Sequence, residues 1–268
     1  MENPNLNLNQ NQLLNVEYHR AYRKLHYGSL FWRITSHLIL FVIFAVFGYV
    51  FMERLTLYYS GFAASILQDR MPEIMLSGIQ LLKQEAWVVS GQGIFPSPIM
   101  LQVVAILSVF IMLIAFLIKK IPLPIRLGAK VAAFMSLFGC LYFWLWGNHF
   151  PYDLYDFSVL YLSAETGMWF AIPAMLAFAL MPIPVSILKK ALLILFVMIY
   201  TFVFGSLRYA LFLFILAKYS YLWMAMLYFV FGAFFDFAFM IAFYSYFISL
   251  AAPGIFKNRG IWRWLYSS

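Results

Sequence analysis

Three ionisable residues, Glu165, Arg208 and Asp236, lie in or at the edge of long apolar runs. Ionisable groups inside a bilayer are costly and usually face protein, water or a charged partner. An arginine fork can pair with carboxylates on two sides and neutralise most of the buried charge. We therefore expect the three helices that carry these residues to meet on their charged faces. Such a cluster would fix helix register, bind a polar substrate, support catalysis or carry protons.

The composition predicts that these runs are membrane helices. The chain is 65% hydrophobic and 10% charged, whereas a soluble domain has about 25% charged and about 45–50% apolar residues. The runs are continuously apolar and reach the length of about 20 residues that a spanning helix needs, while a barrel would show short alternating strands. We predict an all-α, polytopic integral membrane helix bundle whose environment is the lipid bilayer.

Six runs are long enough to span. They cover about residues 36–52, 98–118, 131–146, 159–181, 191–217 and 221–250. Lys and Arg gather before the first run, between the second and third, between the fourth and fifth, and after the sixth. By the positive-inside rule this pattern predicts a multi-pass protein of the bacterial inner (cytoplasmic) membrane with both termini cytoplasmic. The net charge of +8 then reflects topology, and no nucleic-acid partner is expected.

The segment between the first two spans has apolar residues at helical spacing, from Leu67 to Leu82, with charged residues on the other face. This pattern predicts an amphipathic helix over residues 60–86 on the outer side, although Pro72 and Gly78 could interrupt it. The predicted organisation is a polar cytoplasmic tail (1–33), three spans with the amphipathic helix (34–147), three further spans (148–252) and a basic cytoplasmic tail (253–268).

Other residue types point to no chemistry. The chain has one cysteine, Cys140, so it can form no internal disulfide and has no Cys/His cluster for a metal. His149 lies near Asp153 and Asp156 without a nucleophile motif, and we interpret it as an interfacial residue. His37, near the start of the first span, is interpreted in the same way. We expect no metal and no cofactor.

Three short segments carry a resemblance to a known family: "SAETG" at 163–167, "GSLRYALF" at 205–212 and "GAFFDFAF" at 232–239. Their order resembles that of the exosortase/archaeosortase family of membrane-embedded cysteine transpeptidases. In that family, successive helices carry motifs like Glu-Ala-Cys-Ser-Gly, Asn-x-x-Arg-Ile and His-Asp. The resemblance covers about residues 150–250, the last three predicted spans.

The catalytic positions of the family differ in this chain. Glu165 stands at the place of the nucleophilic Cys, Phe235 at that of the His, and Gly205 at that of the Asn. The positions that fit the pattern are Ala164, Gly167, Arg208 and Asp236. A thiolate attacks because a neighbouring base activates it, and Glu with Phe cannot do this in the same way. The resemblance therefore implies a degenerate, non-catalytic relative, that is, a pseudoenzyme.

Three functions fit these residues. The first is a non-catalytic subunit of a larger envelope complex of the secretion, conjugation, pilus or polysaccharide-export type, with other membrane proteins as partners. The second is a transpeptidase- or protease-like membrane enzyme with Glu165, Arg208 and Asp236 as candidate catalytic residues, since a carboxylate can act as nucleophile or base. The third is a small transporter or channel, which would need a polar pathway or broken helices with internal repeats. Loss of the family's catalytic residues favours the first.

Overall fold

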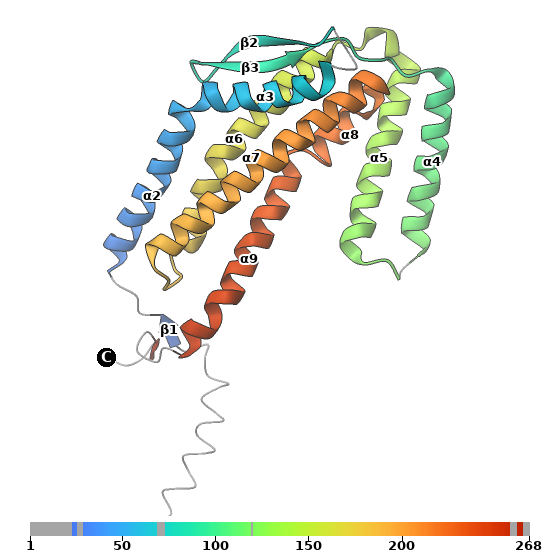
Figure 1. Ribbon diagram of the computed structural model, residues 1–268. Coiled ribbons are helices and arrows are strands. Elements are labelled where there is room, and N and C mark those ends of the chain that lie inside the picture. The colour runs from blue at the N-terminus through green and yellow to red at the C-terminus, as the bar shows by residue number, and fades with distance from the viewer. Residues whose placement is uncertain (1–22, 26–28, 69–72, 119, 258–261, 265–268) are drawn as a thin grey trace, which may run out of the picture.

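The computed structural model describes residues 23–25, 29–68, 73–118, 120–257 and 262–264 (Figure 1). Within these residues, six helices are long and apolar enough to cross a membrane. They are α2 (Leu30–Val50), α4 (Pro98–Leu117), α5 (Leu123–Trp146), α6 (Leu154–Leu180), α7 (Ile187–Lys218) and most of α9 (Ala233–Lys257). The predicted all-α, multi-pass membrane architecture is confirmed.

Several helices extend beyond their predicted bounds. Helix α5 begins directly after Pro122, eight residues before the predicted span, because proline is well suited to a helix start. Helix α2 begins at Leu30, with the side chain of Ser29 as its N-cap, and α9 continues to Lys257. The two tails are therefore shorter than the predicted 1–33 and 253–268, because α2 begins before residue 33 and α9 ends after residue 253. Most residues of the predicted tails lie outside the described ranges. Two short strands from them, β1 (Arg23–Leu25) and β4 (Trp262–Trp264), pair antiparallel.

The sixth predicted span is not one continuous helix. Residues 221–250 comprise the 3-10 helix η3 (Tyr221–Trp223), the short helix α8 (Met224–Phe229) and the first part of α9. Gly232 lies in the break, and a Cβ there would collide with the backbone carbonyl of Tyr228. Only glycine fits so close a backbone approach. A uniformly apolar sequence gave no sign of this break except the glycine itself.

The predicted amphipathic helix over 60–86 is wrong from residue 73 onward, and residues 69–72 lie outside the described ranges. A helix does follow the first span, α3 (Met52–Gln68), but the chain then forms a hairpin of β2 (Met75–Leu81) and β3 (Gln84–Ser90). Leu82 and Lys83 both have positive φ, of 50° and 67°, as a two-residue hairpin turn requires. Short apolar runs fit the period of a helix as well as that of a strand. In β3, buried residues lie on either side of the less buried Trp87, as the alternation of a strand requires.

Helix α3 and the hairpin cover one end of the bundle, which we call the capped end (Figure 1). The hydroxyl of Ser60 donates to the carbonyl of Trp87, and the Trp87 amide donates to the Thr56 hydroxyl at 3.3 Å. The Val89 amide donates to the Tyr209 hydroxyl of α7 at 3.2 Å. These bonds fix the cap to the spanning helices.

Helix α6 is the central helix, and the α4–α5 pair is peripheral. Half of the apolar window of α6 is buried, compared with 17% for α4 and for α5. The α4–α5 pair packs on the rest of the protein through a small cluster of Val104, Cys140 and Leu222. Figure 1 shows the pair standing beside the bundle formed by α2, α6, α7 and α9.

Candidate functional site

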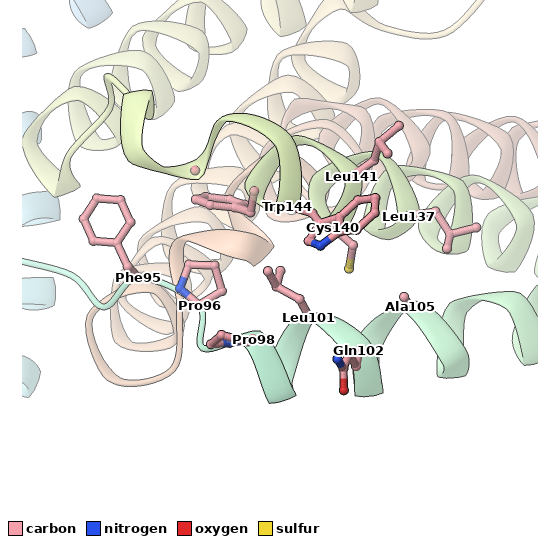
Figure 2. A pocket seen from close by; sticks show the side chains of 12 residues that line it. Phe95, Pro96, Pro98, Leu101, Gln102, Ala105, Leu137, Cys140, Leu141 and Trp144 are labelled. Carbon is pink, nitrogen blue, oxygen red and sulfur yellow. The ribbon is translucent and has the colours of Figure 1, made fainter.

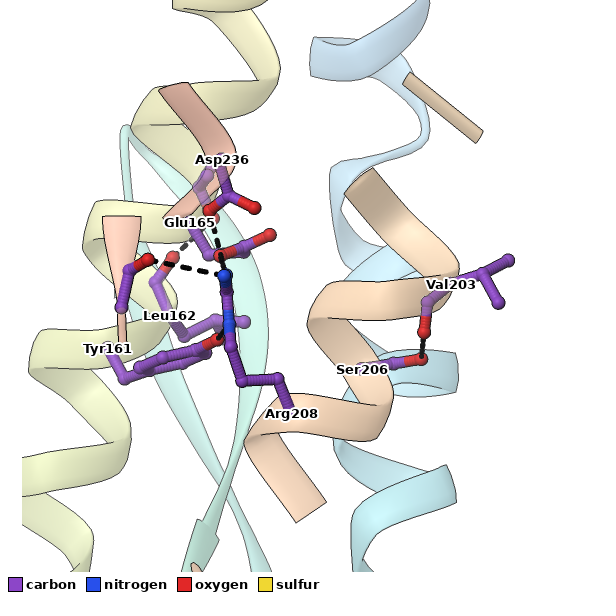
Figure 3. A network of polar contacts seen from close by, with 9 residues as sticks. Tyr161, Leu162, Glu165, Val203, Ser206, Arg208 and Asp236 are labelled. Carbon is purple, nitrogen blue, oxygen red and sulfur yellow. Dashed lines mark hydrogen bonds and ion pairs between the residues drawn. The ribbon is translucent and has the colours of Figure 1, made fainter. Parts of the chain in front are cut away.

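Arg208 joins three helices at one buried cluster, shown in Figure 3. Its Nη2 lies 3.0 Å from Oε2 of Glu165 on α6 and 2.7 Å from Oδ2 of Asp236 on α9. Its Nε donates to the hydroxyl of Tyr161 at 2.7 Å, and Nη1 donates to the carbonyl oxygen of Gly232 at 3.2 Å. The prediction that the three charged residues meet is confirmed. We call these three residues with Tyr161 the Arg208 cluster.

Two glycines make this geometry possible. A Cβ at position 205 would lie 2.5 Å from Oε1 of Glu165 and 2.7 Å from the Tyr59 hydroxyl, so Gly205 leaves the space that these groups occupy. The break at Gly232 leaves its carbonyl outside a regular helix, where it accepts from the Phe235 amide as well as from Arg208. The cluster therefore needs glycine at positions 205 and 232 as well as its charged side chains.

The Arg208 cluster is closed to its surroundings. Glu165 is 1% exposed, Asp236 2% and Arg208 6%. Two carboxylates face one guanidinium, so the cluster carries one excess negative charge if both acids are ionised. Breaking a buried pair by removing one partner typically costs about 3–5 kcal/mol, because the remaining charge is left uncompensated. The arrangement is therefore a strong constraint on helix register.

Some buried polar atoms beside the cluster have no hydrogen-bond partner in the described part of the chain. They are Oε1 of Glu165, the hydroxyl of Tyr59 and Nε1 of Trp169. The Tyr59 ring packs edge-on against Trp169, with ring centroids 5.9 Å apart. Burial raises the pKa of Tyr59 well above its usual value, so this hydroxyl stays protonated.

The positions taken from the transpeptidase resemblance bring no thiol and no imidazole to the cluster. Phe235 packs between Phe231 and Phe239, with ring centroids 5.7 and 5.6 Å away. Cys140 lies on α5 in the separate cluster with Val104. Of the ionisable residues that fit the family pattern, this leaves Arg208 and Asp236, which are paired with each other, while Glu165 stands at the place of the Cys.

Among the described residues, no group of three or more His, Cys, Asp and Glu side chains could hold a metal ion. The acidic residues near His149 have a local role, because Asp153 and Asp156 form the capping box at the start of α6. The amide of Asp156 donates to Oδ1 of Asp153 at 2.8 Å, and the amide of Asp153 donates to Oδ2 of Asp156 at 3.1 Å. His149 itself is exposed.

A second polar cluster lies at the end of the bundle opposite the cap and was missed from the sequence. Lys190, predicted as a loop residue, is inside α7 and is 1% exposed. Its Nζ lies 3.0 Å from Nε2 of His37, whose Nδ1 lies 2.7 Å from the carbonyl oxygen of Arg33. His37 is therefore part of a helix contact. The sequence did not reveal the contact between Lys190 and His37, because Lys190 is adjacent to Lys189 and a pair of lysines is typical of a loop.

Tyr161 of the Arg208 cluster and Tyr59 beside it were also missed. Tyr161 precedes Glu165 by four residues, which places both on one face of a helix; this spacing could have revealed it. Tyr59 comes from α3, and no sequence pattern connects it with Glu165.

A cavity with a volume of about 1050 Å³ lies between α4 and α5 (Figure 2). Its walls include Phe95, Leu101, Gln102, Cys140 and Trp144. It belongs to the peripheral pair and not to the Arg208 cluster.

No protein-family model matches the chain, and neither a curated protein nor a solved structure matches it. The exosortase/archaeosortase resemblance consequently remains a hypothesis based on the three short segments. What the structure establishes is a multi-pass helical membrane protein with a buried three-helix ionic cluster.

Proposed function

We propose that this protein is a non-catalytic membrane subunit of a larger envelope complex, with a degenerate exosortase-like core formed by its last three spans. The observation that carries the proposal is the state of Arg208. Its guanidinium donates to acceptors on α6, on α9 and in the break before α9. A group so fully engaged acts as a joint between helices, and it has little capacity left for a substrate.

The replacement of family residues fits a structural role. Glu165 extends into the space in front of Gly205, where the family motif would carry an Asn. The larger side chain at position 165 and the missing side chain at position 205 therefore compensate each other in volume. This pairing favours a core that has been repacked around the arginine after loss of the catalytic residues.

The peripheral α4–α5 pair supports the subunit role. Its buried apolar contact with the rest of the protein is the small cluster of Val104, Cys140 and Leu222, and a cavity of about 1050 Å³ lies between its two helices. Apolar surface facing lipid needs no partner, but a loosely attached helix pair gains stability from a neighbouring protein. We propose that partners bind beside this pair, in the bacterial inner membrane, with both termini of the chain in the cytoplasm.

A membrane enzyme is the second candidate, because Oε1 of Glu165 has no hydrogen-bond partner among the described residues. A buried carboxylate oxygen of this kind could act as a base or nucleophile. The two proposals differ in what Glu165→Gln does. Loss of processing of a tagged substrate, with the protein still folded, would support the enzyme.

The test of the subunit proposal is purification of the tagged full chain at native expression level in a mild detergent. We expect the same set of membrane proteins in fixed ratios with the wild type and with Glu165→Gln. A well-behaved chain without companions would contradict the proposal.

A further inference from the structure

A second cavity, of about 310 Å³, lies between α2, α3, α6 and α7. It is lined by Ile43, Phe44, Phe47, Gly48, Leu55, Trp169, Leu195, Met198, Ile199 and Phe202. These residues come from α2, α3, α6 and α7. The surface that these side chains present to the cavity is apolar, since the indole N–H of Trp169 is enclosed by protein.

The cavity runs from the lipid-facing surface into the protein. Ile43 and Ile199 are 59% and 54% exposed, whereas Trp169 is 5% exposed and Gly48 is buried. Because α2 and α7 are membrane-spanning helices, the open side of this cavity faces hydrocarbon. Its occupant must therefore come from the bilayer.

The shape of the cavity fits one extended chain. Leu195 and Phe202 are about two turns apart on α7, or roughly 10 Å along the helix axis. Leu55 belongs to α3 at the capped end, so the cavity extends from the cap toward the membrane interior. A helix with its side chains is about 10–12 Å wide, and a volume of about 310 Å³ spread over this length is too narrow to hold one.

Trp169 closes the inner end of the cavity. It is 5% exposed, and its Nε1 is enclosed by protein, so the cavity meets the apolar part of the ring. The ring contacts that of Tyr59 on α3, so this end of the cavity lies beneath the cap.

We propose that this cavity binds one acyl chain of a membrane glycerolipid, packed against the ring of Trp169 at its inner end. The lipid belongs to the leaflet nearest α3, with its chain directed toward Leu195. Glycerolipid is the committed class because the site is a narrow apolar slot that opens onto hydrocarbon, and acyl chains are what the bilayer offers there. This inference does not depend on the function proposed above.

The experiment uses the full chain in nanodiscs that contain phosphatidylglycerol with a photoreactive diazirine in one acyl chain. After illumination, mass spectrometry maps the adducts along the sequence. We expect adducts concentrated on the buried side of the cavity, at Phe44, Met198 and Phe202. Lipid-exposed residues of α4, outside the cavity, report the background of random contact.

Glycine substitutions provide a matched pair of variants. Gly48 lines the cavity, and its nearest neighbour beyond the added Cβ is Phe170 at 3.6 Å, so Gly48→Leu fills the slot without a backbone clash. Gly167→Leu adds the same side chain to an exposed position of α6 with nothing within 4 Å. We expect Gly48→Leu to lower cavity adducts by about tenfold and Gly167→Leu to leave them unchanged.

If Gly48→Leu does not give a monodisperse protein, Met198→Trp blocks the same slot from α7. Adducts spread evenly over α2, α4 and α7 and unaffected by a folded blocking variant would overturn the proposal. So would a polypeptide, instead of lipid, cross-linked at Phe44.

Discussion

At the residue scale, the arginine fork decides the stability of the Arg208 cluster. Three of its nitrogens donate, at 2.7–3.2 Å, to two carboxylates, a phenol and a carbonyl. A guanidinium presents five N–H groups in a fixed plane, whereas an ammonium is a compact point charge. Geometry and charge are therefore both required at this position.

Arg208→Lys should destabilise the protein by several kcal/mol even though the charge is kept, because Lys cannot reach all four acceptors and leaves buried oxygens unpaired. Thermal unfolding in detergent, followed by loss of monodispersity, measures the effect. The matched control is Arg54→Lys, at an exposed position on α3, which should change stability by less than about 0.5 kcal/mol. Equal behaviour of the two variants would rule out a structural role for the fork.

Glu165→Gln should be tolerated, in contrast. Gln keeps an oxygen that can accept from Arg208, and its substitution removes the excess negative charge from a cluster of two acids and one base. We expect a change in the free energy of unfolding of less than about 1 kcal/mol in either direction. The same unfolding assay checks this, and a loss as large as that of Arg208→Lys would mean that the second negative charge is needed.

At the element scale, the cluster exists because backbones approach closely at two glycines. Gly205→Ala would drive a Cβ against Glu165 and Tyr59, and overpacking of this kind costs about 1–3 kcal/mol. Gly128→Ala on α5, with nothing within 4 Å, should instead be neutral or stabilising by about 0.5–1 kcal/mol, as helix propensity predicts. The ranking of the two unfolding midpoints is the measurement. The reverse ranking would show that α6 and α7 are not tightly packed here.

The elements also show what the sequence could predict. Spanning helices follow from composition, and the meeting of Glu165, Arg208 and Asp236 follows from the cost of charge in hydrocarbon. The hairpin of β2 and β3 did not follow, because its apolar spacing also fits a helix and its turn uses Leu82 and Lys83 in place of glycine. The break before α9 did not follow either, since periodicity carries no signal in a uniformly apolar run.

Buried basic residues illustrate a further limit. Lys190 is adjacent to Lys189 in sequence, yet one is buried beside His37 and the other is exposed. The positive-inside rule counts both alike, so it predicts orientation without revealing which lysine has a packing role. Only the tertiary arrangement of α2 and α7 distinguishes them.

At the scale of the whole molecule, the cap and the lysine-rich turns lie at opposite ends of the bundle. Our proposed orientation places the cap outside the cytoplasm. In a Cys140→Ala background, Lys83→Cys in the hairpin turn should react with a membrane-impermeant maleimide added to intact spheroplasts. Lys189→Cys, exposed near the start of α7, should react only after lysis. The opposite labelling pattern would invert the topology.

We propose that this chain is a subunit without catalysis of its own, and the mass of the protein in a native preparation tests this proposal most directly. The chain alone is 31.2 kDa. Native mass spectrometry of the tagged protein released from its own membrane should give a heavier assembly with different polypeptides in fixed stoichiometry, unchanged by Glu165→Gln. A stable 31.2 kDa species that carries only lipid would contradict the account.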